Sequence, residues 1–195
     1  MPRAGLTTAI VTQEAGRLAD EVGFENLTLS ALALRLGIRQ PTLYKHVDGT
    51  TGLHREMAVL AKTELADVIR RAAVGRARDE GLVVIANAYR AWAIEHPGRY
   101  AATVRAATPG DLDDEQAGLE ALKVVTDVLE GYGLSGDDTI DVARALRATL
   151  HGFVTLQLAG GFGYPVDIDR SFDRMVQGLI KAIAQWNIVN QAETE

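Results

Sequence analysis

The sequence predicts an all-α protein of about nine helices. Three observations lead to this class. Apolar residues recur at three- and four-residue spacing over most of the 195 residues, as they do on the buried face of a helix. Aromatic residues make up only 6% of the chain, a low share for a β-sandwich or barrel. No segment alternates apolar and polar residues in the way that a half-buried strand does.

Three short helices are expected near the N-terminus. The first follows a threonine cap and ends at Gly23. The second follows Thr28 or Ser30 and ends at Gly37. The third has Pro41 in its first turn, where a missing N–H removes no helical hydrogen bond. The expected ranges are about 8–22, 30–36 and 39–47.

Six further helices follow. A long amphipathic helix leads out of the N-terminal part, and turns rich in glycine, proline or aspartate separate the others. The expected ranges are about 51–73, 82–92, 97–107, 111–129, 137–159 and 168–186. We therefore expect two domains, an N-terminal head of residues 1–50 and a helical body of residues 51–195.

Composition excludes several classes of protein. The chain has no cysteine, which excludes a disulfide scaffold, thiol catalysis and cysteine-ligated zinc. No apolar run reaches the roughly 20 residues that span a bilayer, and the first residues lack the apolar core of a signal peptide. The expectation is a soluble, cytoplasmic protein with no membrane partner.

Catalysis and metal binding are not expected either. The serines Ser30, Ser135 and Ser171 lie where they cap or flank helices, outside any nucleophile-elbow pattern. The four histidines are never four residues apart, so the helical spacing of metal ligands is absent. Asp113 and Asp114 are expected on an exposed first helical turn. The sequence therefore predicts no catalytic residue, no cofactor and no metal site.

Charge is unevenly distributed along the chain. The formal net charge is −6, which by itself disfavours a polyanionic partner. Residues 1–55, however, carry six basic and five acidic side chains, whereas the remainder carries 14 basic and 21 acidic ones. A basic head on an acidic body favours docking of DNA on the head alone, with a marked dependence on salt.

The second and third helices fit a helix-turn-helix unit. A tight turn at Gly37 and Ile38 joins them, and in such a unit the second helix of the pair enters the major groove. At the leading end of that helix, Arg39, Gln40 and Thr42 are placed to reach base edges. On architecture alone, a pair of packed helices with no DNA contact remains an alternative interpretation.

The remaining residues of this helix divide into a flank and an inner face. Tyr44, Lys45 and His46 suit phosphate contacts, while Leu43 and Val47 are expected to face inward. The N-termini of the neighbouring helices offer N–H groups to further phosphates. The expected DNA-binding residues are Thr28, Arg39, Gln40, Pro41, Thr42, Tyr44, Lys45, His46 and Thr50.

The segments 29–33, 36–38 and 41–47 resemble the N-terminal DNA-binding domain of the TetR family of transcriptional regulators. The most specific part is a turn glycine followed by Thr-Leu-Tyr, a basic residue and His, here residues 42–46. This resemblance implies that Thr42, Tyr44 and His46 carry the family's DNA contacts. Two positions depart from the pattern, because Val47 stands where Phe is usual and Thr50 where Lys is common.

A second resemblance covers much of the body. The segments 96–100, 150–153 and 156–160 are similar to the WHG-type C-terminal domain of a TetR subgroup. The tryptophan that usually precedes His-Gly is replaced by Leu150. The resemblance implies a body that binds a small molecule and pairs with a second copy.

The body is therefore expected to serve two purposes. The last two helices carry more apolar surface than one partner helix would bury, which favours a homodimer through a four-helix bundle. The middle helices would enclose a pocket for an unknown small apolar or amphipathic ligand. Taken singly, each lining candidate is more often a core residue than a pocket residue. The candidates are Tyr89, Trp92, Tyr100, Thr103, His151, Phe153 and Gln157.

Together these expectations describe a homodimeric transcriptional regulator that binds an operator in double-stranded DNA, a repressor that a small-molecule ligand releases. The alternative is an all-α small-molecule-binding protein or enzyme that does not bind DNA.

Overall fold

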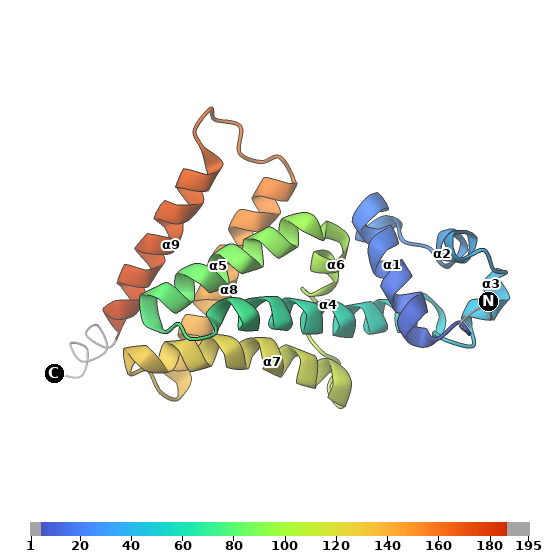
Figure 1. The fold of residues 1–195 in the computed structure, drawn as a ribbon, viewed down its shortest axis with the longest axis horizontal. Helices are drawn as coiled ribbons and strands as arrows, with labels where there is room; N and C mark the ends of the chain where they lie inside the picture. Colours follow the sequence, from blue (N-terminus) through green and yellow to red (C-terminus); the bar gives the residue numbers. More distant parts are fainter. Residues whose placement is uncertain (1–4, 187–195) are drawn as a thin grey trace. The chain divides into compact units, whose positions relative to one another are not determined.

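The computed structural model describes residues 5–186. Within this range it contains nine α-helices, two short 3-10 helices and no strand (Figure 1). The predicted all-α class is therefore confirmed, and no helix of this range is long and apolar enough to cross a membrane. The elements are α1 (Thr8–Val22), η1 (Phe24–Asn26), α2 (Leu29–Leu36), α3 (Gln40–Leu43), α4 (Gly49–Ala73), α5 (Arg78–Glu95), α6 (Pro97–Ala102), α7 (Leu112–Leu129), η2 (Glu130–Tyr132), α8 (Asp137–Leu158) and α9 (Ile168–Ala184).

The chain divides into two compact units. The first comprises Met1–Leu65 and Glu95–Glu120, and the second comprises Ala66–Ile94 and Ala121–Glu195. The long helices α4 and α7 each contribute residues to both units. The first unit thus contains the three head helices together with α6 and the beginning of α7. The expected domain boundary after residue 50 stays a prediction.

Within the first unit, α6 packs directly on α1. Gly98 lies at the closest approach, where an added Cβ atom would stand 2.1 Å from the carbonyl carbon and oxygen of Ala19. A side chain of any other residue would collide with this backbone. On the facing side, a Cβ atom at Gly16 would lie 3.0 Å from Cδ of Arg99. Two glycines therefore allow the two helices to come together.

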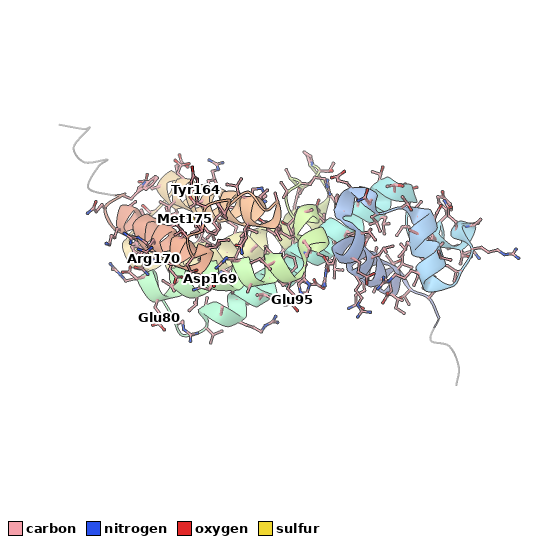
Figure 2. All side chains as sticks on the ribbon, turned by 90° about the horizontal axis from the view of Figure 1, so that it is seen from above. Glu80, Glu95, Tyr164, Asp169, Arg170 and Met175 are labelled. Carbon is pink, nitrogen blue, oxygen red and sulfur yellow. The ribbon has the colours of Figure 1, made fainter. Side chains whose placement is uncertain are left out.

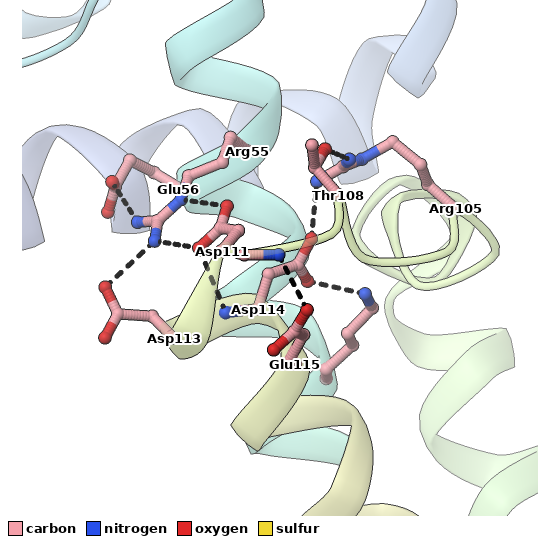
Figure 3. Close-up of polar contacts among 10 residues, drawn as sticks. Arg55, Glu56, Arg105, Thr108, Asp111, Asp113, Asp114 and Glu115 are labelled. Atoms are coloured by element: carbon pink, nitrogen blue, oxygen red, sulfur yellow. Dashed lines mark hydrogen bonds and ion pairs between the residues drawn. The ribbon is translucent and has the colours of Figure 1, made fainter.

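Ion pairs join α4 to the first turn of α7 in the same unit (Figure 3). Asp114, whose side chain is fully buried, accepts hydrogen bonds from Nζ of Lys62 at 2.5 Å and from Nη2 of Arg105 at 2.6 Å. Arg55 donates to both oxygens of Asp111, over 2.8 Å from Nε and 2.5 Å from Nη2. The expectation that Asp114 is exposed is therefore wrong. Its carboxylate is buried, and the cations of Lys62 and Arg105 balance its charge.

The second unit is built around α5, α8 and α9. Phe172 of α9 and Val142 and Val154 of α8 are fully buried, as is Leu82 of α5. Apolar side chains of α9 recur every three or four residues, and Phe172, Val176, Ile180 and Ile183 among them are buried. The exposed residues of α9 are mostly charged or polar, while Met175 and Leu179 are half-buried, and the expected excess of apolar surface on this helix stays a prediction. On α8, by contrast, Leu156 is 51% exposed.

Several helix ends differ from the predicted ones. The helix α5 begins at Arg78 and ends at Glu95, beyond the expected range of about 82–92 on both sides. The helix α6 ends at Ala102, five residues before the expected end. The N–H groups of Thr103 and Val104, directly after the helix, bond to carbonyls three residues back, and the Thr103 hydroxyl donates to the Tyr100 carbonyl oxygen at 2.7 Å. These tighter bonds and a competing side chain end the helix early.

Candidate nucleic-acid interface

The helices α2 and α3 are joined by a tight turn. Thr28 caps α2, its hydroxyl accepting a hydrogen bond from the Ala31 N–H at 3.1 Å. At the other end Gly37 adopts a left-handed conformation with φ of 66°, which glycine reaches without steric cost. The Ile38 N–H then bonds to the Ala33 carbonyl oxygen at 3.0 Å. The predicted turn at Gly37 and Ile38 is therefore confirmed.

We call residues 39–47 the recognition segment. Only Gln40–Leu43 within it form a regular α-helix, and Pro41 lies in the first turn. Beyond this helix the Lys45 N–H bonds to the Thr42 carbonyl, and the His46 N–H to the Leu43 carbonyl, three residues back in each case. The predicted helix over about 39–47 is thus too long, because its second half tightens into 3-10-like turns before α4 begins.

The recognition segment has a buried and an exposed side. Leu43 is fully buried and Val47 is 5% exposed, so the prediction that both face inward is confirmed. Tyr44 is 57% exposed. The predicted DNA-binding residues divide by burial: Arg39, Pro41, Tyr44 and Lys45 are exposed, and Gln40, Thr42 and His46 are half-buried. The exposed side therefore presents a guanidinium, a phenol and an ammonium group.

The helix α1 braces this segment. The hydroxyl of Thr8 donates to the His46 carbonyl oxygen at 3.1 Å. Arg35 of α2 donates to Glu21 of α1 over 2.7 and 2.8 Å, and to Glu14 over 3.1 Å. The adjacent guanidinium lowers the pKa of Glu21. These contacts hold α2 and the recognition segment to one rigid support.

Fewer basic side chains of the N-terminal part are available to a partner than the charge count of the sequence indicates, because some of them form ion pairs within the protein. Arg35 is matched by two glutamates, and Arg55 by Glu56, Asp111 and Asp113. Arg39 and Lys45 are exposed and form no ion pair with the residues that the structure describes. These two cations of the recognition segment are thus available to an anionic partner, whereas Arg35 and Arg55 support the fold.

Two further predicted residues lie at helix starts. The hydroxyl of Thr28 is engaged as the α2 cap. Thr50 is exposed in the first turn of α4, directly after Gly49, whose φ is 62°. Both positions place backbone N–H groups at the positive end of a helix dipole.

The seven ligand candidates fall in both units. Trp92, Tyr100 and Thr103 are 5%, 3% and 6% exposed, and the other four are half-buried. Tyr100 and Thr103 belong to the first unit, and Tyr89, Trp92, His151, Phe153 and Gln157 belong to the second. Burial of His151, together with nearby Arg147, lowers its pKa. The assignment of these residues to a pocket stays a prediction.

Arg90 connects two of these candidates and was not predicted. Its Nε donates to Oε1 of Gln157 at 2.9 Å, and its Nη2 to Oδ1 of Asp169 at 2.6 Å. The guanidinium lies 5.7 Å from the ring centroid of Phe153 and 4.7 Å from that of Phe172. Figure 2 labels Asp169 at the start of α9. A signal was available in the sequence, because Arg90 is a lone cation within an apolar run.

Metal binding finds no support in the described residues: no group of three or more His, Asp or Glu side chains in residues 5–186 is arranged to hold an ion.

Comparison with known proteins finds relatives that span most of the chain. Residues 82–179 match the family model described as the tetracyclin repressor-like C-terminal domain. The chain is 36% identical to the uncharacterized HTH-type transcriptional regulator Rv0681 of Mycobacterium tuberculosis over 174 residues, which cover 89% of this chain and 79% of that protein. It is 31% identical to the uncharacterized HTH-type transcriptional regulator YobS of Bacillus subtilis over 183 residues, or 93% and 95% of the two chains.

Solved structures show the same fold. A TetR variant of Acinetobacter baumannii in complex with minocycline superposes with a TM-score of 0.72 at 22% identity, covering 93% of this chain and 98% of that one. Apo ActR of Streptomyces coelicolor gives a TM-score of 0.72 at 16% identity, covering 93% and 96%. The match extends over the head helices as well as the helices that follow them.

Proposed function

The chain belongs to the TetR family of transcriptional regulators, and from that premise we propose that it is a homodimeric repressor that a small-molecule ligand releases from its operator. DNA binding through the helix-turn-helix follows from the family. The observation that carries the proposal is the exposed side of the recognition segment, where Arg39, Tyr44 and Lys45 stand above the buried Leu43.

The recognition segment is proposed to enter the major groove with its N-terminal end leading. There Arg39, Gln40 and Thr42, with Pro41 between them, meet base edges. Tyr44, Lys45 and His46 meet the phosphate backbone, and the helix starts at Thr28 and Thr50 contribute further phosphate contacts. With two available cations on each recognition segment, we expect modest non-specific affinity and a clear loss of binding as salt increases.

A dimer is proposed because one helix-turn-helix reads only a few base pairs, and two heads read half-sites about one helical turn apart. We place the interface on α8 and α9. Gly152 and Gly178 lie inside these helices, and an added Cβ at either would meet no atom of the described chain within 4 Å. An interior helical glycine costs about 0.5–1 kcal/mol relative to alanine, a cost that close approach of a partner helix would offset.

The ligand is proposed to bind among the buried aromatic residues of the body. The solved A. baumannii relative was crystallised with minocycline, an observation on that protein that supports a small apolar or amphipathic ligand class here. Ligand binding and operator binding must then weaken each other by the same factor. We propose that the ligand contacts the candidate residues of the second unit, which are Tyr89, Trp92, His151, Phe153 and Gln157. A cytoplasmic location belongs to the same proposal, since the operator lies on the chromosome.

Fluorescence anisotropy with the full chain tests the proposal. The probe is labelled duplex DNA from the region upstream of the protein's own gene, and the control is a shuffled duplex of equal length. We expect at least about a 1000-fold preference for the upstream duplex at moderate salt, as specific regulators show. Equal binding of both duplexes would support the alternative, an all-α small-molecule-binding protein or enzyme that does not act on DNA.

A further inference from the structure

Ser30 of α2 and Gln40 of α3 are connected by a side-chain hydrogen bond. The hydroxyl of Ser30 donates to Oε1 of Gln40 over 2.8 Å. The two residues are ten positions apart, on the two helices of the helix-turn-helix. Ser30 is exposed and Gln40 is half-buried. The bond therefore lies at the DNA-facing end of the head rather than in its core.

This hydrogen bond is not required to cap either helix. The cap of α2 is supplied by Thr28, which accepts from the Ala31 N–H. The start of α3 at Arg39 has no side-chain cap. An exposed side-chain hydrogen bond also adds little to folding, because water competes for both partners. With capping and stability set aside, the effect of the bond is to orient the side chain of Gln40. It fixes the carboxamide plane and engages the carbonyl oxygen.

We propose that Ser30 is a positioning residue that sets the base preference of Gln40. The inference rests on the proposed function, because it requires the recognition segment to read the major groove. Glutamine pairs with adenine by using its carbonyl oxygen as acceptor together with its amide as donor. The hydrogen bond from Ser30 uses one lone pair of that oxygen and fixes the carboxamide plane, so the two N–H donors of Gln40 are the groups directed to DNA. Guanine presents two acceptors in the major groove, O6 and N7, and is the base that such a donor fits.

The test begins with selection of binding sites from a random duplex library by the full-length protein. Fluorescence anisotropy then measures the affinity for sites that carry each of the four base pairs at the selected position. Wild type is expected to prefer guanine at one position of each half-site by about tenfold. Gln40→Ala identifies that position by losing the preference there. Ser30→Ala is expected to lose it at the same position, or to move it to adenine, while other positions of the site stay unchanged.

Two further variants separate positioning from folding. Ser30→Thr keeps a hydroxyl at this place and is expected to retain the guanine preference. Ser135→Ala changes an exposed serine of the second unit and should have no effect. Three results would overturn the inference: an unchanged preference in Ser30→Ala, a uniform loss of affinity for all sequences in that variant, or adenine as the wild-type base at the Gln40 position. Failure of wild type to select any sequence would instead refute the proposed function.

Discussion

Arg99 of α6 engages both carboxylate oxygens of Asp20 on α1. Its backbone N–H donates to Oδ1 and its Nε donates to Oδ2, each over 2.8 Å. The same guanidinium donates from Nη1 to Oε2 of Glu64 on α4, also over 2.8 Å. One side chain therefore fixes α6 against the first helix of the head and against the helix that leads out of it.

Removal of this side chain should destabilise the protein. Arg99 and Asp20 are only 16% and 14% exposed as side chains, so Arg99→Ala deprives the carboxylates of Asp20 and Glu64 of the guanidinium in a partly buried place. We expect the free energy of unfolding to fall by about 2–4 kcal/mol, measured by urea denaturation. The matched control is Arg144→Ala, whose partner Asp141 is exposed, with an expected loss below about 0.5 kcal/mol. Equal losses would contradict the assigned role of Arg99.

The close approach of α6 and α1 makes a second prediction. Gly98→Ala forces a methyl group against the backbone of Ala19, where the space is 2.1 Å. We expect a loss of about 2 kcal/mol or more, typical of severe overpacking, with a lower Tm in calorimetry. Gly118→Ala, in α7, meets no atom of the described chain within 4 Å and should raise stability by about 0.5–1 kcal/mol. If both variants behave alike, the helix contact at Gly98 is misplaced.

The head was predictable from local patterns. The side chain of Thr28 caps a helix start, and the backbone preferences of Gly37 and Pro41 fix a helix end and the next start, so the turn of the helix-turn-helix follows from the sequence alone. The inward direction of Leu43 and Val47 follows from helical spacing. The length of the third helix did not follow, because periodicity cannot distinguish an α-helical turn from a 3-10 turn over so few residues.

The partners of the charged residues were not predictable. Lys62 meets Asp114 although 52 positions separate them, and Arg90 meets Asp169 across 79 positions. Such pairs depend on how helices pack, which a charge count along the chain does not contain. The basic character of the head was estimated from Arg35 and Arg55 among others, and the fold uses both arginines for internal ion pairs.

The ion pair of Arg55 and Asp111 predicts an acid-sensitive contribution to stability. Hydrogen bonding from Arg55 lowers the pKa of Asp111 from 3.8 to about 2. A lowered pKa in the folded state means that the contribution is present above 3.8 and disappears as the pH falls towards about 2. We therefore expect Asp111→Asn to be less stable than wild type at neutral pH, and the difference to shrink over this acidic range. Urea denaturation across pH measures it, and a constant difference would contradict the pairing.

Tyr44 offers a test of phosphate contact. This residue of the recognition segment is 57% exposed, and Tyr44→Phe removes only the hydroxyl. We expect DNA binding to weaken about tenfold, as for the loss of one hydrogen bond to a charged group. The loss should be equal for operator and shuffled duplexes, because phosphate contacts carry no sequence information. Tyr164→Phe, at an exposed loop residue of the second unit labelled in Figure 2, is the control. A loss confined to the operator would assign Tyr44 to base reading instead.

The proposed dimer interface predicts that substitutions at two glycines differ in their effect on the oligomeric state. Gly178 of α9 and Gly118 of α7 both have open space around the position of an added Cβ, so neither substitution should disturb the fold of the described chain. Gly178→Glu places a charge where α9 is proposed to meet its copy, and the cost of burying an unpaired carboxylate should shift the protein to monomers. Gly118→Glu should stay dimeric. Sedimentation equilibrium measures both, with operator affinity as a second readout, because a monomer contacts only one half-site. A dimeric Gly178→Glu variant would exclude this face, and a monomeric Gly118→Glu variant would move the interface to α7.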